Sequence, residues 1–137
     1  MPTELIEGHV DELGRPLVRI RVAGLADSVL GLVDTGFNGT ILIPRSQANA
    51  AGFYIFDPKI WVQVAIGSNQ RTLMCDGTIE WFDRTIDVTM LVEIDDPHQQ
   101  IVDGEPIILI GTELLANSTL NIDFAASKIV IRPSNTE

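Results

Sequence analysis

The tripeptide Asp34-Thr35-Gly36 stands between two apolar segments and constrains the fold more than any other feature of the sequence. The flanking segments, Val29–Val33 and Thr40–Ile43, consist mainly of β-branched residues and leucine, which is typical of buried β-strands. Asp, Thr and Gly are also common turn residues, because an Asp side chain can accept a hydrogen bond within its own turn. Two interpretations follow: a structural turn between strands, or a carboxylate presented at the end of a buried strand.

A second apolar segment lies in the last third of the chain. Ile107–Ile110 leads into Gly111, then into a short helix with Leu114-Leu115 and a strand ending at Phe124. With the Asp-Thr-Gly tripeptide upstream, this order and spacing resembles the retropepsin-like aspartic proteases, over residues 17–131. The tripeptide occurs once, and these enzymes use two such carboxylates, so the resemblance implies a symmetric homodimer.

The resemblance implies a single all-β domain over residues 1–137, folded as a closed or partly closed β-barrel with one or two short helices. The chain length suits one domain, and many short strands at close spacing favour a barrel. We expect strands at Glu7–Val10, Leu17–Val22, Val29–Val33, Ile60–Ile66, Arg71–Met74, Thr78–Phe82, Thr85–Val92, Leu120–Phe124 and Lys128–Ile131, a helix at Ser46–Ala51, turns at 67–70 and 83–84, and a polar loop over 95–106.

The resemblance also assigns roles to the residues of both motifs. Asp34 is the catalytic residue, and it would share one proton with Asp34 of the second subunit, as the paired carboxylates of aspartic proteases are known to do. The ionised carboxylate would act as general base on a water, without a covalent intermediate. Thr35 would hydrogen-bond across the two-fold axis, and Gly36 would offer its amide to the carboxylate. Ile110 and Gly111 would brace the active-site loop.

An extended peptide or protein substrate would bind as a β-strand beneath a flap hairpin. The best candidate for the flap is Ala65–Thr72, which has a polar tip between two β-rich arms, although an ordinary surface hairpin would have the same pattern. The residues that we expect to contact substrate are Leu32, Phe37, Asn38, Ile66, Gly67 and Ser68.

Two departures from the family bear on activity. Retropepsins usually carry Ala or Ser after the tripeptide, whereas this chain carries Phe37, whose ring we expect at the mouth of the site, where it would narrow or fill the cleft. Asn38 and Thr112 occupy the positions of an acid and an Arg that pair in viral members, so both partners of that ion pair are absent. The alternatives are a non-catalytic dimeric peptide-binding or assembly module with the same fold, and a monomeric β-barrel adaptor.

Charge and composition restrict the partners. The net charge of −10 argues against nucleic acid or an anionic membrane surface as a partner. We expect a cytoplasmic protein, because the sequence shows no signal-peptide pattern and no apolar run of the ~20 residues that span a bilayer. Cys75 is the single cysteine, and His9 and His98 are far apart, so we expect neither a metal site nor a cofactor.

Overall fold

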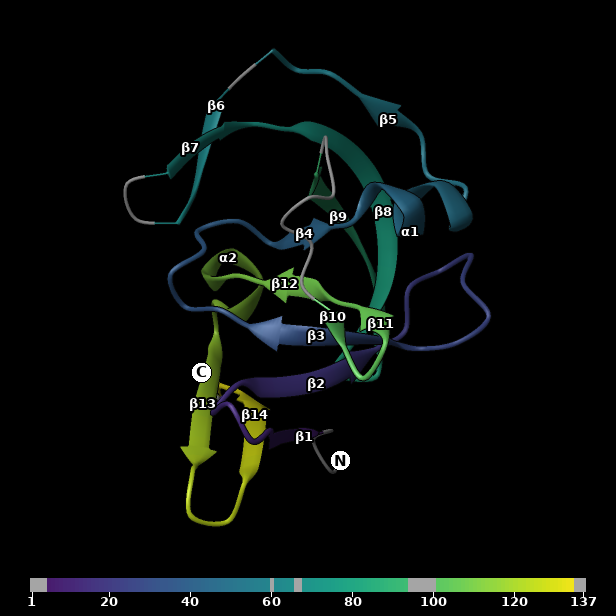
Figure 1. The fold of residues 1–137 in the computed structure, drawn as a ribbon. Helices are drawn as coiled ribbons and strands as arrows, with labels where there is room; N and C mark the ends of the chain where they lie inside the picture. Colours follow the sequence, from purple (N-terminus) through teal and green to yellow (C-terminus); the bar gives the residue numbers. More distant parts are fainter. Residues whose placement is uncertain (1–4, 60, 66–67, 94–100, 135–137) are drawn as a thin grey trace.

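The computed structural model describes residues 5–59, 61–65, 68–93 and 101–134. Most of them lie in β-strands, and two short helices complete the fold (Figure 1). The predicted site residues Ile66 and Gly67, and the predicted loop residues 95–100, lie outside the described residues. The elements are β1 (Ile6–Val10), β2 (Pro16–Ile20), β3 (Val29–Val33), β4 (Ile41–Ile43), α1 (Arg45–Ala50), β5 (Ile55–Phe56), β6 (Trp61–Ala65), β7 (Ser68–Arg71), β8 (Leu73–Trp81), β9 (Arg84–Val92), β10 (Ile101–Val102), β11 (Glu105–Pro106), β12 (Ile108–Ile110), α2 (Thr112–Leu115), β13 (Ser118–Asp123) and β14 (Lys128–Pro133).

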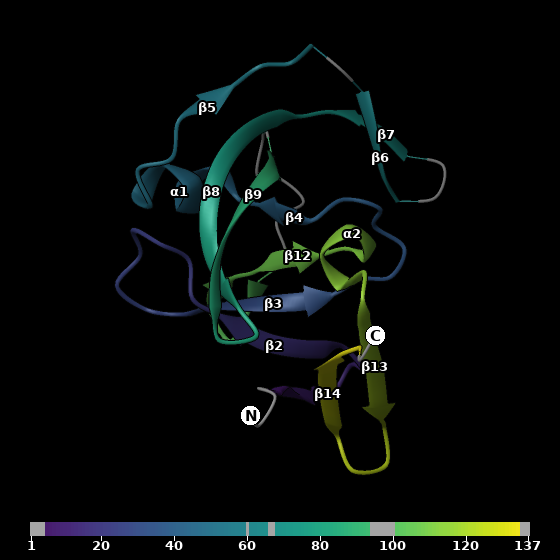
Figure 2. The ribbon, with the colours of Figure 1, turned by 180° about the vertical axis from the view of Figure 1, so that it is seen from behind.

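Ten strands form one strongly curved sheet, in the order β13-β14-β1-β2-β3-β12-β4-β9-β8-β5. The long strand β8 sweeps around the others as an arc (Figure 2). Just beyond the end of β2, Val22 forms a β-bridge with Ile79 of β8, and the Glu80 N–H donates to the Arg21 carbonyl at 3.0 Å. The sheet therefore returns to its own second strand and is partly closed, which confirms the predicted all-β, partly closed architecture.

The short strand β12 lies between β3 and β4 although it comes late in the chain. It runs parallel to β3, with Ile110 opposite Val33, and antiparallel to β4, with Ile110 opposite Ile41. These central strands are almost wholly apolar and buried, as expected where both faces of a sheet are covered. Because β3 and β12 are parallel neighbours in register, their C-terminal ends meet and bring Asp34 beside Gly111.

The main core is filled by side chains that alternate inward along the curved strands. In β13, for example, Leu120 and Ile122 are half-buried whereas Asn121 and Asp123 are exposed. Burying one such large apolar side chain completely contributes roughly 1.5–3 kcal/mol. The fully buried members of the main cluster include Ile41, Ile43, Ile79, Met90, Val92, Ile108, Ile110, Ile129 and Ile131.

Both helices are short. Helix α1 begins after Pro44, whose φ of −59° suits entry into a helix, and ends before Gly52, whose φ of +79° favours a residue without a Cβ. The helix lies within one residue of the prediction. No helix in the described part of the chain is long and apolar enough to cross a membrane.

Two turns differ from the prediction. The β8–β9 turn is Phe82-Asp83, one residue earlier than predicted, and both residues are left-handed, with φ of 53° and 62°. This backbone is that of a tight type I′ hairpin, in which the strand register fixes the turn position. The return strand of the β6–β7 hairpin starts at Ser68, three residues earlier than predicted and inside the predicted turn 67–70, and Leu73 and Met74 belong to β8.

The predicted polar loop before β12 contains a small hairpin, β10–β11. The Arg19 guanidinium binds both oxygens of the Glu105 carboxylate, at 3.1 and 3.0 Å, and this hydrogen-bonded contact lowers the pKa of Glu105. The Gln47 side-chain amide donates to the Pro106 carbonyl at 2.9 Å. The hairpin is therefore attached to β2 and to α1 directly before the chain enters β12.

The Cys75 thiol provides a test of the core. Cys75 is fully buried in the main cluster, and burial, with a smaller contribution from Asp76, raises the pKa of its thiol to about 11. Each pKa unit lowers the thiolate fraction tenfold, so at pH 8 we expect a thiol reagent to label the native protein at least ~100-fold more slowly than the unfolded chain. Comparing labelling rates with and without urea measures this ratio, and equal rates would contradict the burial of Cys75.

Candidate active site

Asp34 lies directly after β3 and is held by its neighbours in the chain and in β12. Its N–H donates to the Ile110 carbonyl at 2.9 Å, which continues the β3–β12 pairing past the strand end. The Gly36 N–H donates to Asp34 Oδ1 at 2.9 Å, and the Phe37 N–H donates to the Asp34 carbonyl at 3.1 Å. Asp34 is half-buried, and Thr35 beside it is exposed. The loop therefore orients a carboxylate at an accessible position.

The rest of this loop is bonded to the backbone that follows β12. Three N–H groups at the start of α2 donate to three carbonyls of the loop, which satisfies groups that a helix N-terminus leaves without an intrahelical partner. The bonds run from Gly111 to Thr40 at 2.9 Å, from Thr112 to Phe37 at 2.9 Å, and from Glu113 to Gly39 at 3.1 Å. The second motif is thus bonded to the Asp34 loop along most of its length.

Gly111 is at the closest approach between the two motifs. A Cβ at this position would overlap the Gly39 carbonyl oxygen and lie 2.6 Å from Phe37 Cδ2 and 2.7 Å from the Phe37 carbonyl oxygen. The φ of Gly111 is −104°, a value open to any residue. The glycine is therefore required by space and not by backbone conformation. Ile110, the preceding residue, is fully buried in the core.

The position of Phe37 differs from the expectation. We expected its ring at the mouth of the site, but the side chain is fully buried in a cluster with Leu42 and Leu91. The ring points from the loop into the protein, because an apolar pocket lined also by Met74 and Leu109 lies beneath it. In this conformation the Phe37 side chain has no exposed surface with which to contact a substrate.

The other described residues that we expected to contact substrate differ in their exposure and surroundings. Asn38 is exposed on the Asp34 loop, whereas Leu32 is half-buried and packs against the cluster that includes Leu17 and Ile107. Strands β6 and β7 form an antiparallel pair with Ala65 opposite Ser68, so Ser68 is the first residue of the return strand. Figures 1 and 2 both place this hairpin above the segment between β3 and β4.

Sequence reasoning missed several residues that hold the loop. Gly39 and Thr40 supply carbonyl acceptors, and the Thr40 hydroxyl donates to the Thr89 carbonyl of β9 at 2.6 Å. Thr112 was noted only as a departure from viral members, yet its N–H holds the Phe37 carbonyl. These contacts use the backbone or a generic hydroxyl, so side-chain identity carries little signal of them.

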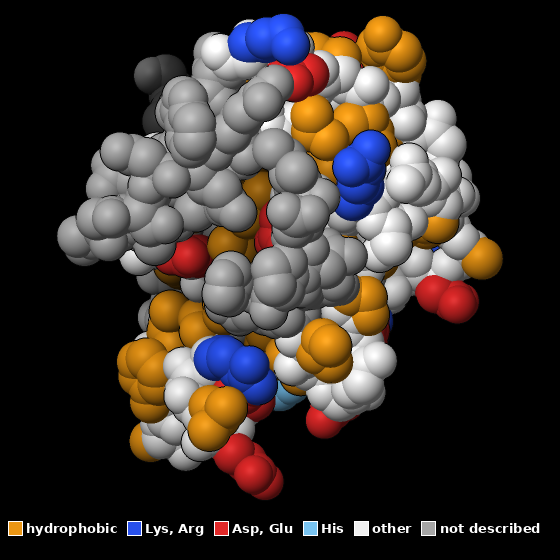
Figure 3. Space-filling model, turned by 45° about the horizontal axis from the view of Figure 1, so that its top comes forward, with side chains coloured by type: hydrophobic (Ala, Val, Ile, Leu, Met, Phe, Trp, Pro, Cys, Tyr) orange, Lys and Arg blue, Asp and Glu red, His pale blue; other side chains and the backbone are white. Residues whose placement is uncertain are grey.

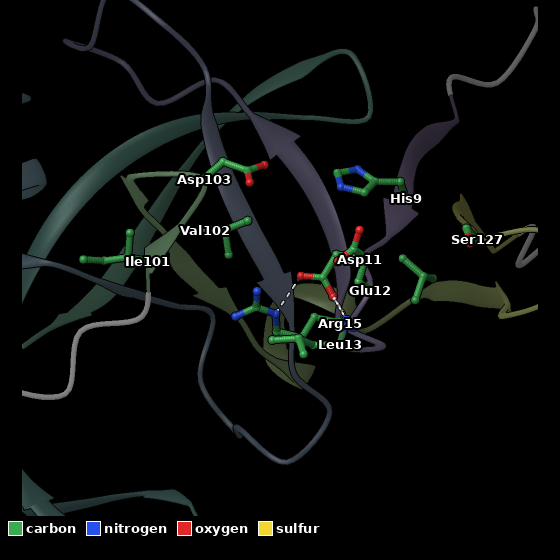
Figure 4. A pocket seen from close by; sticks show the side chains of 10 residues that line it. His9, Asp11, Glu12, Leu13, Arg15, Ile101, Val102, Asp103 and Ser127 are labelled. Atoms are coloured by element: carbon green, nitrogen blue, oxygen red, sulfur yellow. Dashed lines mark hydrogen bonds and ion pairs between the residues drawn. The ribbon is translucent and has the colours of Figure 1, made fainter.

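A separate hollow of about 670 Å³ lies between the β1–β2 turn and β10 (Figure 4). Two of its charged side chains, Asp11 and Arg15, pair with each other. Asp11 accepts from the Arg15 N–H and pairs with the Arg15 side chain at 2.7 Å, and these contacts lower the pKa of Asp11. Among the described residues, no three His, Cys, Asp or Glu side chains gather where they could hold a metal ion. This hollow is therefore a weaker candidate for chemistry than the Asp34 loop.

The top of the molecule, which carries the β6–β7 hairpin, faces the viewer in Figure 3. Basic side chains of the described residues lie apart from one another on this face, with acidic side chains between them. A continuous basic stripe, as nucleic-acid-binding surfaces carry, is not seen among the described residues of this face.

Comparison with solved structures identifies the architecture. A retropepsin-like aspartic protease from Rickettsia conorii superposes with a TM-score of 0.66 at 18% sequence identity, over 96% of this chain and 94% of that one. The chain has the retropepsin-like fold. The EIAV protease, solved with a bound inhibitor, matches with a TM-score of 0.54 at 20% identity, over 74% of this chain and 85% of that one.

No protein-family model and no curated protein matches the sequence. At identities of 18% and 20%, the similarity to the solved structures establishes the fold alone. Within this retropepsin-like fold, Asp34-Thr35-Gly36 follows β3, and Gly111 follows the parallel strand beside it.

Replacing Gly111 tests the junction of the two motifs. We expect Gly111→Ala to lower the free energy of unfolding by about 3 kcal/mol, because the new Cβ meets backbone atoms that cannot move without breaking the loop's hydrogen bonds. Urea denaturation measures the change.

The neighbouring substitution Thr112→Val is the matched control. It removes only the long hydroxyl contact to the Phe37 carbonyl, at 3.4 Å, and keeps the backbone bond. We expect a loss below ~1 kcal/mol. A Gly111→Ala protein as stable as Thr112→Val would contradict the close approach described here.

Proposed function

We propose that this protein is an aspartic endopeptidase that acts as a homodimer and hydrolyses peptide bonds with one Asp34 from each subunit. The observation that carries the proposal is the Asp34 loop: a single carboxylate at an accessible position, oriented by the Gly36 N–H and bonded to a second motif through backbone. The fold is that of aspartic proteases, which supports this chemistry.

The chemistry follows from two carboxylates held in contact. Two negative charges held in contact repel each other, so the two carboxylates would share one proton between them. The ionised Asp34 would take a proton from a water, which attacks the peptide carbonyl, while the protonated Asp34 would polarise that carbonyl. Thr35, exposed next to Asp34, would bond to the other subunit across the two-fold axis.

The arrangement of strands supports the edge of the sheet at β13 as part of the dimer interface. β1 is flanked by β14 and β2, and β14 by β13 and β1, so these terminal strands have partners within the chain. The sheet ends on one side at β13, whose outer edge has no partner strand in the described sheet. In Figures 1 and 2, β13 descends from α2 on the side that carries the loop between β3 and β4. A second copy whose Asp34 meets this Asp34 would also meet β13.

The alternative function is a non-catalytic dimeric module that binds or assembles peptides with the same fold. Its main support in the sequence was Phe37, as a ring that could obstruct the cleft. Because that ring is buried in the core, it gives no reason to prefer the non-catalytic module over the enzyme. The monomeric adaptor predicts no dimer, which light scattering at micromolar concentration tests directly.

Proteolysis by the wild type and by Asp34→Asn tests the catalytic assignment. We expect cleavage of a denatured protein or peptide library between about pH 3 and 7, and a loss of at least ~100-fold in Asp34→Asn, which cannot act as general base. Asp27→Asn, exposed in the loop before β3 and so at the other end of that strand from Asp34, is the matched control and should retain activity.

Mixing the two proteins separates a shared site from one complete in each chain. Excess Asp34→Asn should inhibit the wild type, because mixed dimers carry one carboxylate. Activity that survives in Asp34→Asn itself would mean that the site is elsewhere, and a dimeric wild type without activity would favour the non-catalytic module.

A cysteine in β13 tests the proposed interface independently of activity. If β13 pairs with its copy about an axis through Asn121, Leu120 lies opposite Ile122 and Thr119 opposite Asp123, which keeps apolar side chains on one face and avoids facing charges. Facing Cβ atoms in such pairs are ~4.5–5.5 Å apart, near disulfide range.

We therefore expect Asn121→Cys to give a disulfide-linked dimer on mild oxidation, seen by non-reducing electrophoresis. Asp27→Cys, exposed in the loop before β3 and so at the other end of that strand from Asp34, is the control and should remain monomeric on the gel. A protein that is dimeric in solution but does not cross-link through Asn121→Cys would place the interface elsewhere.

A further inference from the structure

Phe37 is the one large aromatic side chain in the Asp34 loop, and its whole ring is buried. The ring lies on Leu42 of β4 and Leu91 of β9, with Met74 and Leu109 at the margin of the cluster. These neighbours belong to four different strands of the curved sheet. The side chain thus anchors a surface loop to the interior at a point three residues after Asp34.

The backbone of Phe37 is bonded both to Asp34 and to the second motif. Its N–H donates to the Asp34 carbonyl at 3.1 Å, and its own carbonyl accepts from the Thr112 N–H at 2.9 Å. Any shift of Phe37 is therefore transmitted to Asp34 on one side and to the second motif on the other.

Two glycines enclose the ring. A Cβ on Gly39 would lie 2.6 Å from Phe37 Cζ and 3.0 Å from Cε1, and its three nearest atoms all belong to this ring. A Cβ on Gly111 would lie 2.6 Å from Phe37 Cδ2. The ring therefore occupies the space that side chains at Gly39 and Gly111 would need, and the three positions fit one another as a set.

We infer that Phe37 is a positioning residue: its buried ring, wedged between Gly39 and Gly111, sets the position of the Asp34 carboxylate from inside the protein. The catalytic consequence of this inference rests on the proposed aspartic protease function, whereas the position of the ring and its effect on the loop do not. A smaller side chain leaves an unfilled space under the loop, so the loop gains freedom and the carboxylate loses its fixed geometry.

Kinetics of Phe37→Leu test the catalytic consequence. Leucine keeps the site apolar but lacks the outer ring atoms, so we expect kcat to fall ~10-fold with KM unchanged, because the carboxylate is misplaced while the substrate surface remains. Ile129→Val is the matched control, as Ile129 is also fully buried but lies in β14. The control should lower Tm by a comparable few degrees and leave kcat within about twofold.

A second experiment measures position without any activity. Hydrogen exchange at the Asp34 amide reports the bond to the Ile110 carbonyl, and at the Gly36 amide the bond to Asp34 Oδ1. We expect both amides to exchange at least ~10-fold faster in Phe37→Leu and to be unchanged in Ile129→Val. A chain without proteolytic activity but with this exchange pattern would overturn the proposed function and keep the positioning role.

Double mutants test the fit of the ring against the glycines. Gly39→Ala alone should lower Tm, and Phe37→Leu should relieve most of that loss, because the atoms that oppose the new Cβ are the ring atoms that leucine lacks. Gly111→Ala should not be relieved by Phe37→Leu, because its Cβ also meets two backbone carbonyls. Additive losses for Gly39→Ala and Phe37→Leu, or Asp34 exchange unaffected by Phe37→Leu, would overturn the inference.

Discussion

The hydrogen bond from the Asp34 N–H to the Ile110 carbonyl is the constraint on which the site depends, because it extends the pairing of β3 and β12 into a loop. A parallel pair buried on both faces is held in register, because a slip by one residue would exchange side chains of the main core, such as Val33, with those that pack on the other face, such as Leu32. That register places Gly111 under the loop, and the bonds from the start of α2 follow from it. The orientation of one carboxylate thus derives from the packing of the most buried strands.

Local signals in the sequence predicted much of this fold. The strands at both ends of the chain were predicted to within two residues and α1 to within one, because these features depend on neighbours in sequence. The pairing of two motifs was predicted from their resemblance to a known family, and the structure brings Asp34 and Gly111 together in the same way. Gly111 has no space for a side chain, so its identity carried information about a contact with residues distant in the sequence.

The wrong predictions concern side chains whose environment comes from distant parts of the chain. Phe37 follows a polar turn, so its local context indicated an exposed ring; its burial depends on Leu42 and Leu91, which only the folded sheet brings together. The error of one residue in the predicted β8–β9 turn has a similar cause. Phe82 takes a turn position that favours small residues, and its ring packs on Trp81 with centroids 5.1 Å apart and against the core.

The position of β12 in the chain has a consequence for the order in which the protein is assembled. Asp34 is made early during synthesis, but Gly111, Thr112 and Glu113, which bind its loop, are made only after β1 to β12 have been completed. Contacts between such distant segments carry a high entropic cost of loop closure and form late in folding. A growing chain therefore carries this carboxylate without fixed geometry until Gly111, Thr112 and Glu113 have been made and can bind its loop.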